Sequence, residues 1–158
     1  MTFGVATKAR LETPVREFQQ SGLLISTARE RLDLAIIHEF LTASPWAKGI
    51  SRETVERALQ TSFCFGVYEG ERQVGFARVI TDFATFAYVC DFFIVESHRG
   101  RGLAKWLISS ILECPDIRCL QRTCIVTAEA HGFYRQMGFM GVQRPDAYLE
   151  LVNKDAYK

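Results

Sequence analysis

The chain has 158 residues, of which 48% are hydrophobic and 23% are charged, and its formal net charge is +1. This composition is ordinary for a globular protein and argues against a disordered chain, while the length suits one domain with its own core. A near-neutral chain gives no basis for a general nucleic-acid or membrane surface, and the lack of a long apolar run or a signal-peptide pattern makes a cytoplasmic location the expectation.

The N-terminal segment is weakly patterned. Residues 1–20 are mostly polar, and we expect them to be loosely ordered or to form a short helix from Val15. Residues 21–158 are expected to form one domain, because no linker, repeat or low-complexity tract divides them.

Apolar periodicity and turn residues predict alternating strands and helices along the rest of the chain, as in an α/β protein built around one mixed sheet. Ser51 should cap a helix, and the apolar run 86–95 should form a central strand covered on both faces. In chain order we predict a strand at 23–26, helices at 32–41 and 51–59, strands at 63–68, 74–81 and 86–95, a helix at 103–113, a strand at 123–126, a short helix between Thr127 and Gly138, and strands at 139–142 and 148–152.

The five cysteines show no pattern typical of a zinc site or a disulfide framework. Their number is odd, there is no Cys-x-x-Cys pair, and no nearby histidine completes a ligand set. We therefore expect neither a structural disulfide nor a metal site.

The most informative stretch is Arg-Gly-Arg-Gly-Leu-Ala at 99–104, between the apolar run 92–95 and the helical pattern that follows. A glycine turn between a strand and a helix points several backbone N–H groups at one spot, next to the positive end of the helix dipole. Cations are normally disfavoured there, yet Arg99, Arg101 and Lys105 cluster at this helix start. A bound anion, such as a pyrophosphate, explains them.

These six residues alone do not require an anion. The glycines can serve only to make a tight connection, with the cations keeping the surface wet. A dinucleotide- or nucleotide-binding loop is disfavoured, because the third glycine of the Rossmann pattern is missing and no lysine directly follows Gly102.

The flanking residues favour the anion site. The turn resembles the acetyl-CoA pyrophosphate-binding motif of the GNAT superfamily (GCN5-related N-acetyltransferases), Arg/Gln-x-x-Gly-x-Gly/Ala, with Arg99, Gly102 and Ala104 at its three fixed places. Residues 130–139 resemble a second landmark of that family, a helix that carries a tyrosine, here Tyr134, and runs into Gly-Phe.

The resemblance covers about residues 22–152 and implies the GNAT fold, an α/β fold with a central mixed, mostly antiparallel, twisted sheet of about seven strands flanked by about four helices. It also implies acetyl-CoA as cosubstrate, with no metal. The implied cofactor-binding residues are the strand end Phe92, Phe93 and Ile94, and the turn residues Arg99, Gly100, Arg101, Gly102, Leu103, Ala104 and Lys105.

For catalysis, the resemblance implies that Tyr134 lies beside the CoA sulfur as general acid. Asp91 is our candidate for the general base, because it is the only acid within the apolar run 86–95, where a carboxylate is either paired or has a raised pKa. Two alternatives stay open: Asp91 is a structural partner of a nearby arginine such as Arg78, or an ordered water is the base.

The acceptor should enter opposite CoA, between the first two helices and the loop before residue 86. Aromatic and acidic residues there suggest an aromatic-walled pocket for a cationic amine, although the aromatic side chains are equally suited to a core. The candidate substrate-binding residues are Trp46, Asp82, Phe83, Phe86 and Tyr88.

Together these features predict an acetyl-CoA-dependent N-acetyltransferase that acts on a primary amine of a small molecule, by direct attack in a ternary complex. The alternative is a non-catalytic acyl-CoA-binding sensor on the same fold. We expect neither nucleic acid nor membrane as partner, and exposed edge strands near the C-terminus leave room for a homodimer.

Overall fold

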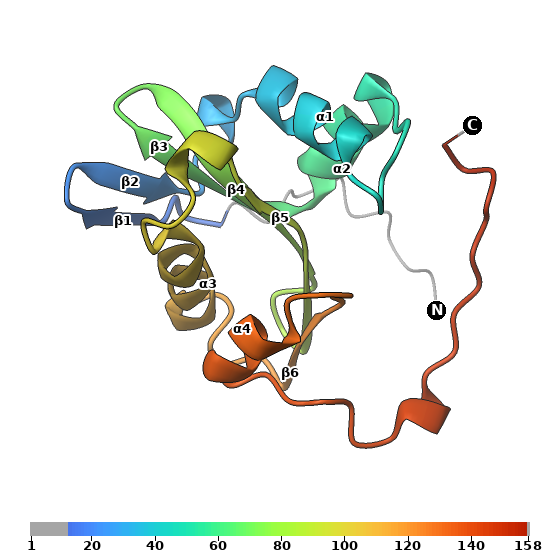
Figure 1. The fold of residues 1–158 in the computed structure, drawn as a ribbon. Helices are drawn as coiled ribbons and strands as arrows, with labels where there is room; N and C mark the ends of the chain where they lie inside the picture. The colour runs from blue at the N-terminus through green and yellow to red at the C-terminus, as the bar shows by residue number, and fades with distance from the viewer. Residues whose placement is uncertain (1–12, 158) are drawn as a thin grey trace, which may run out of the picture.

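The computed structural model describes residues 13–157. It contains a curved sheet of six strands (Figure 1), and the order of the strands in the sheet is the same as their order in the chain. All neighbouring strands are antiparallel except β5 and β6, which are parallel because a helix connects them. The strands are β1 (Glu17–Gln20), β2 (Leu23–Ser26), β3 (Phe63–Glu69), β4 (Arg72–Thr81), β5 (Phe86–Ile94) and β6 (Arg122–Ile125).

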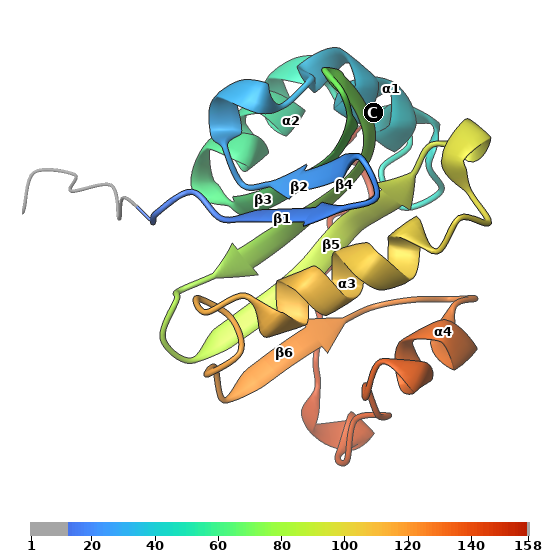
Figure 2. The same ribbon diagram turned by 90° about the vertical axis from the view of Figure 1, so that its left-hand side faces the viewer.

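Four helices cover the two faces of the sheet. The helices are α1 (Leu34–Ala43), α2 (Arg52–Thr61), α3 (Leu103–Glu113) and α4 (His131–Gln136), with short 3-10 turns at Arg29–Arg31, Glu96–His98 and Pro145–Ala147. Helices α1 and α2 lie on one face, while α3 crosses the other and α4 follows the end of β6 (Figure 2). The expected α/β fold, with a mixed and mostly antiparallel sheet, is confirmed.

Most of the predicted elements are present, with bounds shifted by a few residues. The predicted cap of α2 is confirmed, because the Ser51 hydroxyl accepts a hydrogen bond from the Thr54 N–H at 3.2 Å. Helix α1 begins after Asp33, whose carboxylate accepts hydrogen bonds from the first backbone N–H groups of the helix. None of the helices in residues 13–157 combines the length and the apolar character that a membrane span requires.

The hydrophobic core is split by the sheet into two parts. On one face, Leu107, Ile108 and Ile111 of α3 pack against strand residues such as Val89. On the other face, α1 and α2 pack over Phe76 and Phe93, and the Phe40 ring stacks on Phe93 with centroids 3.9 Å apart. Because both layers meet on β4 and β5, these two strands are fixed from both sides along their middle.

A β-bulge at Asp91 changes which way the side chains of β5 point. Phe76 pairs with Phe93 and Arg78 pairs with Cys90, so β5 has one residue more than β4 between the two pairs. Asp91 takes the left-handed conformation, with φ +51°, which is uncommon for a residue other than glycine. The bulge turns this carboxylate toward the α1 and α2 face of the sheet, where it meets Trp46.

Three expectations are wrong. Residues 17–20 form β1 and not a helix from Val15, and residues 1–12 lie outside the described residues. Strand β5 is not a central strand covered on both faces: it is the second strand from the sheet edge, and its first residue, Phe86, is 41% exposed. No strand forms at 139–142 or 148–152, although their apolar alternation is strand-like, because neither segment pairs with β6, the outermost described strand, and an alternating sequence forms a strand only when it pairs with an edge.

The α3 layer of the core makes a testable prediction. Leu107→Ala should lower the free energy of unfolding by about 2–5 kcal/mol, since this side chain is completely buried and its loss leaves a cavity between α3 and the sheet. Urea unfolding measures the change. Glu113→Ala, an exposed position on the same helix, is the matched control and should stay within about 0.5 kcal/mol of the parent. Equal effects of the two changes would contradict the packing.

Candidate functional site

The centre of the site is a split between the two parallel strands. Pairing of β5 with β6 runs only from Phe86 opposite Arg122 to Val89 opposite Ile125. Strand β5 continues to Ile94, so the β6-facing edge of residues 90–94 has no strand partner among residues 13–157. An extended ligand can therefore use the backbone groups of this edge as a neighbouring strand would.

The glycine turn lies directly after this open edge. Gly100 and Gly102 have φ of +74° and +78°, and nothing lies within 4 Å of where a Cβ would stand on either. The first backbone hydrogen bond of α3 joins the Trp106 N–H to the Gly102 carbonyl, so the N–H groups of the helix residues before it have no partner within the helix. Open space in front of unpaired donors is suited to an anion.

The cations of the turn have different surroundings. Arg99 Nε donates to the Ile94 carbonyl at 3.2 Å, and Arg101 donates to Glu69 at 3.1 Å. Glu69 also accepts from the buried His98, and these hydrogen bonds, first His98 and then Arg101, lower the pKa of its carboxyl. Lys105 is exposed and has no ion-pair partner within residues 13–157. Glu69 thus fastens the turn to the end of β3, and Lys105 keeps its charge available.

Tyr134 brings the second motif to the open edge of β5. Its ring, 7% exposed, meets those of Phe92, Phe133 and Phe139 edge to face at centroid distances of 6.2, 4.9 and 5.8 Å. Burial raises the pKa of its hydroxyl to about 12. This hydroxyl makes no hydrogen bond to any described residue, so it is a neutral and uncommitted proton donor beside residues 90–94.

Asp91 is paired on both carboxylate oxygens. Arg78 Nε donates to Oδ2 at 2.6 Å, and Trp46 Nε1 donates to Oδ1 at 3.3 Å. Arg78 also donates to the Ser62 hydroxyl at 3.2 Å. Burial opposes the charge of Arg78, but the nearby Asp91 carboxylate favours it, and the net direction of the Arg78 pKa is upward. The structure thus places Asp91 in the arginine pairing that the sequence left open, with one lone pair per oxygen still unused.

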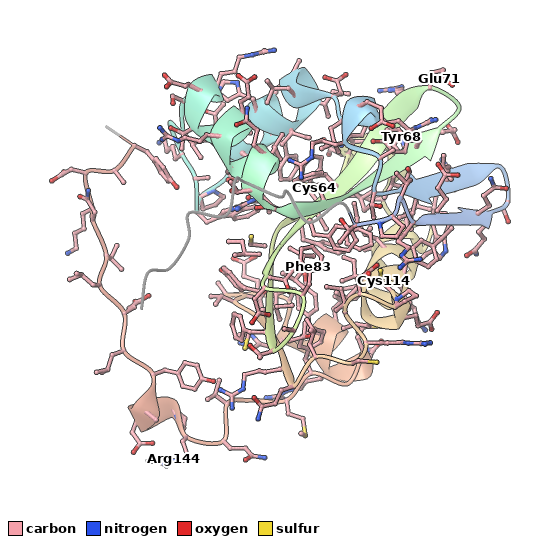
Figure 3. The ribbon with its side chains drawn as sticks, turned by 180° about the vertical axis from the view of Figure 1, so that it is seen from behind. Cys64, Tyr68, Glu71, Phe83, Cys114 and Arg144 are labelled. Atoms are coloured by element: carbon pink, nitrogen blue, oxygen red, sulfur yellow. The ribbon has the colours of Figure 1, made fainter. Side chains whose placement is uncertain are left out.

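The candidate acceptor residues fall into two groups. Three candidates lie on the α1 and α2 face of the sheet and are at least partly exposed: Trp46, Phe86 and Tyr88. Phe86 and Tyr88 are two positions apart on β5. Asp82 caps the turn between β4 and β5, where three backbone N–H groups and the Thr85 hydroxyl donate to it and lower its pKa. Phe83, labelled in Figure 3, packs edge to face on Phe63 at a centroid distance of 5.2 Å and lies against the α3-side core. Phe86 and Tyr88 thus share one face of β5, and Trp46 lies on the same side of the sheet beside Asp91.

Two residues of this region were missing from the sequence-based site. Glu69 and His98 hold the glycine turn, but 29 positions separate them, and no local pattern links the end of one strand to a histidine that follows another. All five cysteines are free, and no group of three or more His, Cys, Asp or Glu side chains in residues 13–157 is arranged to hold a metal ion.

The comparisons with known proteins agree with this geometry. Residues 60–140 match the sequence model of the Acetyltransferase (GNAT) domain. A protein of Gibberella zeae assigned as an acetyltransferase is 27% identical over 150 residues, covering 80% of this chain and 84% of that protein.

Solved structures show the same fold. A protein of Xanthomonas campestris pv. campestris, assigned to the GNAT family of acetyltransferases, is 39% identical with a TM-score of 0.84 and covers 88% of this chain and 99% of its own. A GNAT family acetyltransferase from Elizabethkingia anophelis with acetyl-CoA bound is 14% identical with a TM-score of 0.61, covering 86% of this chain and 91% of its own. The domain match over half of the chain and the 39% identity over most of it show that this protein belongs to the GNAT family of N-acetyltransferases.

Proposed function

We propose that this protein transfers an acetyl group from acetyl-CoA to a primary amine of a small molecule, by direct attack in a ternary complex. The observation that carries the proposal is the position of Tyr134, whose buried ring packs on Phe92 beside the unpaired edge of β5 and whose hydroxyl has no hydrogen-bond partner among the described residues. A proton donor, an open strand edge and an anion-binding turn then follow one another along one side of the sheet, which suits a long thioester ending in a pyrophosphate.

The turn would hold the pyrophosphate through the free N–H groups at the start of α3, with the charge of Lys105 nearby. The backbone of Phe92, Phe93 and Ile94 at the open end of β5 would bind the amide groups of the pantetheine arm as a neighbouring strand would, next to the Ile94 carbonyl that already accepts from Arg99. The acetyl-CoA seen in the Elizabethkingia anophelis relative supports this assignment of the cosubstrate.

The chemical step balances with the residues at hand. The amine nitrogen attacks the thioester carbonyl carbon, a C–N bond forms and the C–S bond breaks. Asp91 would first take a proton from the substrate ammonium through one of its unused lone pairs, which frees the nitrogen lone pair for attack. Tyr134 would give its proton to the departing thiolate, and the second proton that the nitrogen loses as the amide forms would restore the Tyr134 phenol. A backbone N–H of the 92–94 edge would stabilise the oxyanion, so we assign no metal to the reaction.

The acceptor would lie on the face opposite α3. Trp46, Phe86 and Tyr88 offer an aromatic wall, and the Asp91 carboxylate offers the negative charge that attracts an ammonium group. With a net charge of +1 the chain has no strongly basic or acidic balance for a polymeric acceptor, so a small amine fits this face best.

Gly102→Val tests the turn. Acetyl-CoA affinity should fall at least tenfold, about 1.4 kcal/mol, because the side chain fills the open space in front of the free N–H groups. Gly22→Val is the matched control: Gly22 has the same φ of +78° and the same open surroundings, but it lies in the β1–β2 turn. Calorimetry on both folded variants measures the affinity for acetyl-CoA. A loss of affinity in both variants, or in neither, contradicts the anion site.

Tyr134→Phe tests the proton donor. Turnover should fall roughly 100-fold with little change in the KM for acetyl-CoA, since only a group that acts in the transition state is removed. Because the pKa of Tyr134 is about 12, the parent should show no loss of turnover from this group up to about pH 11. Tyr68→Phe, which deletes a buried hydroxyl on β3, is the control and should keep full turnover. Near-normal turnover of Tyr134→Phe would leave the tyrosine a packing residue.

Asp91→Asn tests the proton acceptor. Asparagine keeps the shape but has a single acceptor oxygen, so it can accept from only one of Arg78 and Trp46; turnover should fall about 100-fold or more while the fold persists. Asp116→Asn is matched to it, because Asp116 also pairs with an arginine, Arg16, at 2.7 Å but lies away from the site. Both variants should lose similar stability. If Asp91→Asn turns over as fast as Asp116→Asn, the proton leaves to water instead.

A further inference from the structure

The side of the sheet that α1 and α2 cover carries a row of apolar side chains beyond the reach of these helices. Opposed residues of neighbouring strands point to the same face, so Ile80, Tyr88 and Cys124 lie side by side across β4, β5 and β6. Phe86, opposite Arg122, forms the next row toward the β4–β5 turn. The residues that alternate with them face the α3-side core, and Figure 1 shows α1 and α2 at one end of the sheet and β6 at the other. Ile80, Phe86, Tyr88 and Cys124 are hereafter the apolar strip.

The apolar strip is open to water and continues the proposed acceptor site. Ile80 and Phe86 are 43% and 41% exposed, and the other two side chains are partly buried. The next row inward pairs Arg78 with Cys90, and Arg78 holds the Asp91 carboxylate. A ligand bound at Asp91 therefore meets the strip as soon as it extends along β5. Exposed apolar side chains gathered in this way indicate a contact surface.

The charges around the apolar strip admit one ammonium group. At the inner end the Asp91 carboxylate is available to it. At the outer end Arg122 donates to the Tyr148 hydroxyl at 2.7 Å and has no ion-pair partner within residues 13–157. The nearby Asp82 accepts from the N–H groups and the hydroxyl of its own turn. A second ammonium on the strip would lose water without gaining a free carboxylate, which is unfavourable.

We propose that the acceptor is a monoamine with an apolar body, whose ammonium group lies at Asp91 and whose body lies on the apolar strip. This inference rests on the proposed acetyl transfer and names the class of its acceptor. From the Arg78–Cys90 row to the Phe86–Arg122 row the strip is about 13 Å long, at a rise of about 3.3 Å for each strand residue. That length suits a chain such as that of octylamine, and the charges disfavour polyamines and other acceptors with several ammonium groups.

Matched acceptors are the first test. With the parent protein and acetyl-CoA, kcat/KM for octylamine should exceed that for its terminal diamine, the same chain with a second amino group at the far end, by about tenfold or more. From butylamine to octylamine it should rise about twofold for each added methylene, because one side of the chain leaves water. A diamine that reacts as fast as octylamine, or a rate that does not change with chain length, overturns the acceptor class while acetyl transfer stands. Absence of turnover with every amine overturns the proposed function itself, and the acceptor class with it.

Ile80→Glu then tests where the apolar body lies. The new carboxylate should lower kcat/KM for octylamine about tenfold and raise it for the diamine, with acetyl-CoA affinity unchanged. Val15→Glu makes the same kind of change at an exposed residue before β1, at the opposite edge of the sheet, and should alter neither rate. An octylamine-to-diamine ratio that Ile80→Glu leaves at the parent value overturns the placement. Light scattering covers the other occupant: a parent dimer that Ile80→Glu dissociates means that a second copy covers the strip, which also overturns the proposal.

Discussion

The end of pairing between β5 and β6 is the constraint on which the rest of the site depends. Beyond Val89 and Ile125 the two parallel strands have no hydrogen bonds to each other, although β5 runs on to Ile94. Backbone groups are obligatory hydrogen-bonding groups, so an edge left open this close to the core is stable only with water or a ligand on it. The glycine turn and Tyr134 both lie along this edge, so a ligand bound to it would meet both.

The bulge at Asp91 is the counterpart of that opening on the other face of the sheet. Without the extra residue, the side chains of β5 would alternate strictly between the two faces of the sheet from Tyr88 to Phe93. The left-handed backbone at Asp91 instead directs a carboxylate to Arg78 and Trp46, on the side that α3 does not cover. Cosubstrate and acceptor can therefore approach the same few residues of β5 from different sides, as direct transfer requires.

Sequence reasoning succeeded where a residue type at a given position is compatible with only one local structure. Left-handed glycines between a strand and a helix, a serine before a helix, and an apolar face on 103–113 each point to a single local structure, and all are present. It failed where the outcome depends on partners far along the chain, since residues 148–152 alternate like a strand but pair with no described strand. It also did not show that Asp82 accepts hydrogen bonds within its own turn or that Phe83 packs in the α3-side core. The pairing of Glu69 with His98 likewise depends on the register of the sheet.

The shortness of β6 explains both the opening and the free outer edge. Its four residues pair with the first four of the nine in β5, so anything that adds to its outer side can extend only along residues 122–125. A strand there would be separated from β5 by β6 itself and would not contact residues 90–94, where the cosubstrate would bind. The outer edge of β6 and the open edge of β5 are therefore different surfaces, and covering one does not block the other. A longer β6 would close the split and remove the site, whatever it added to the sheet.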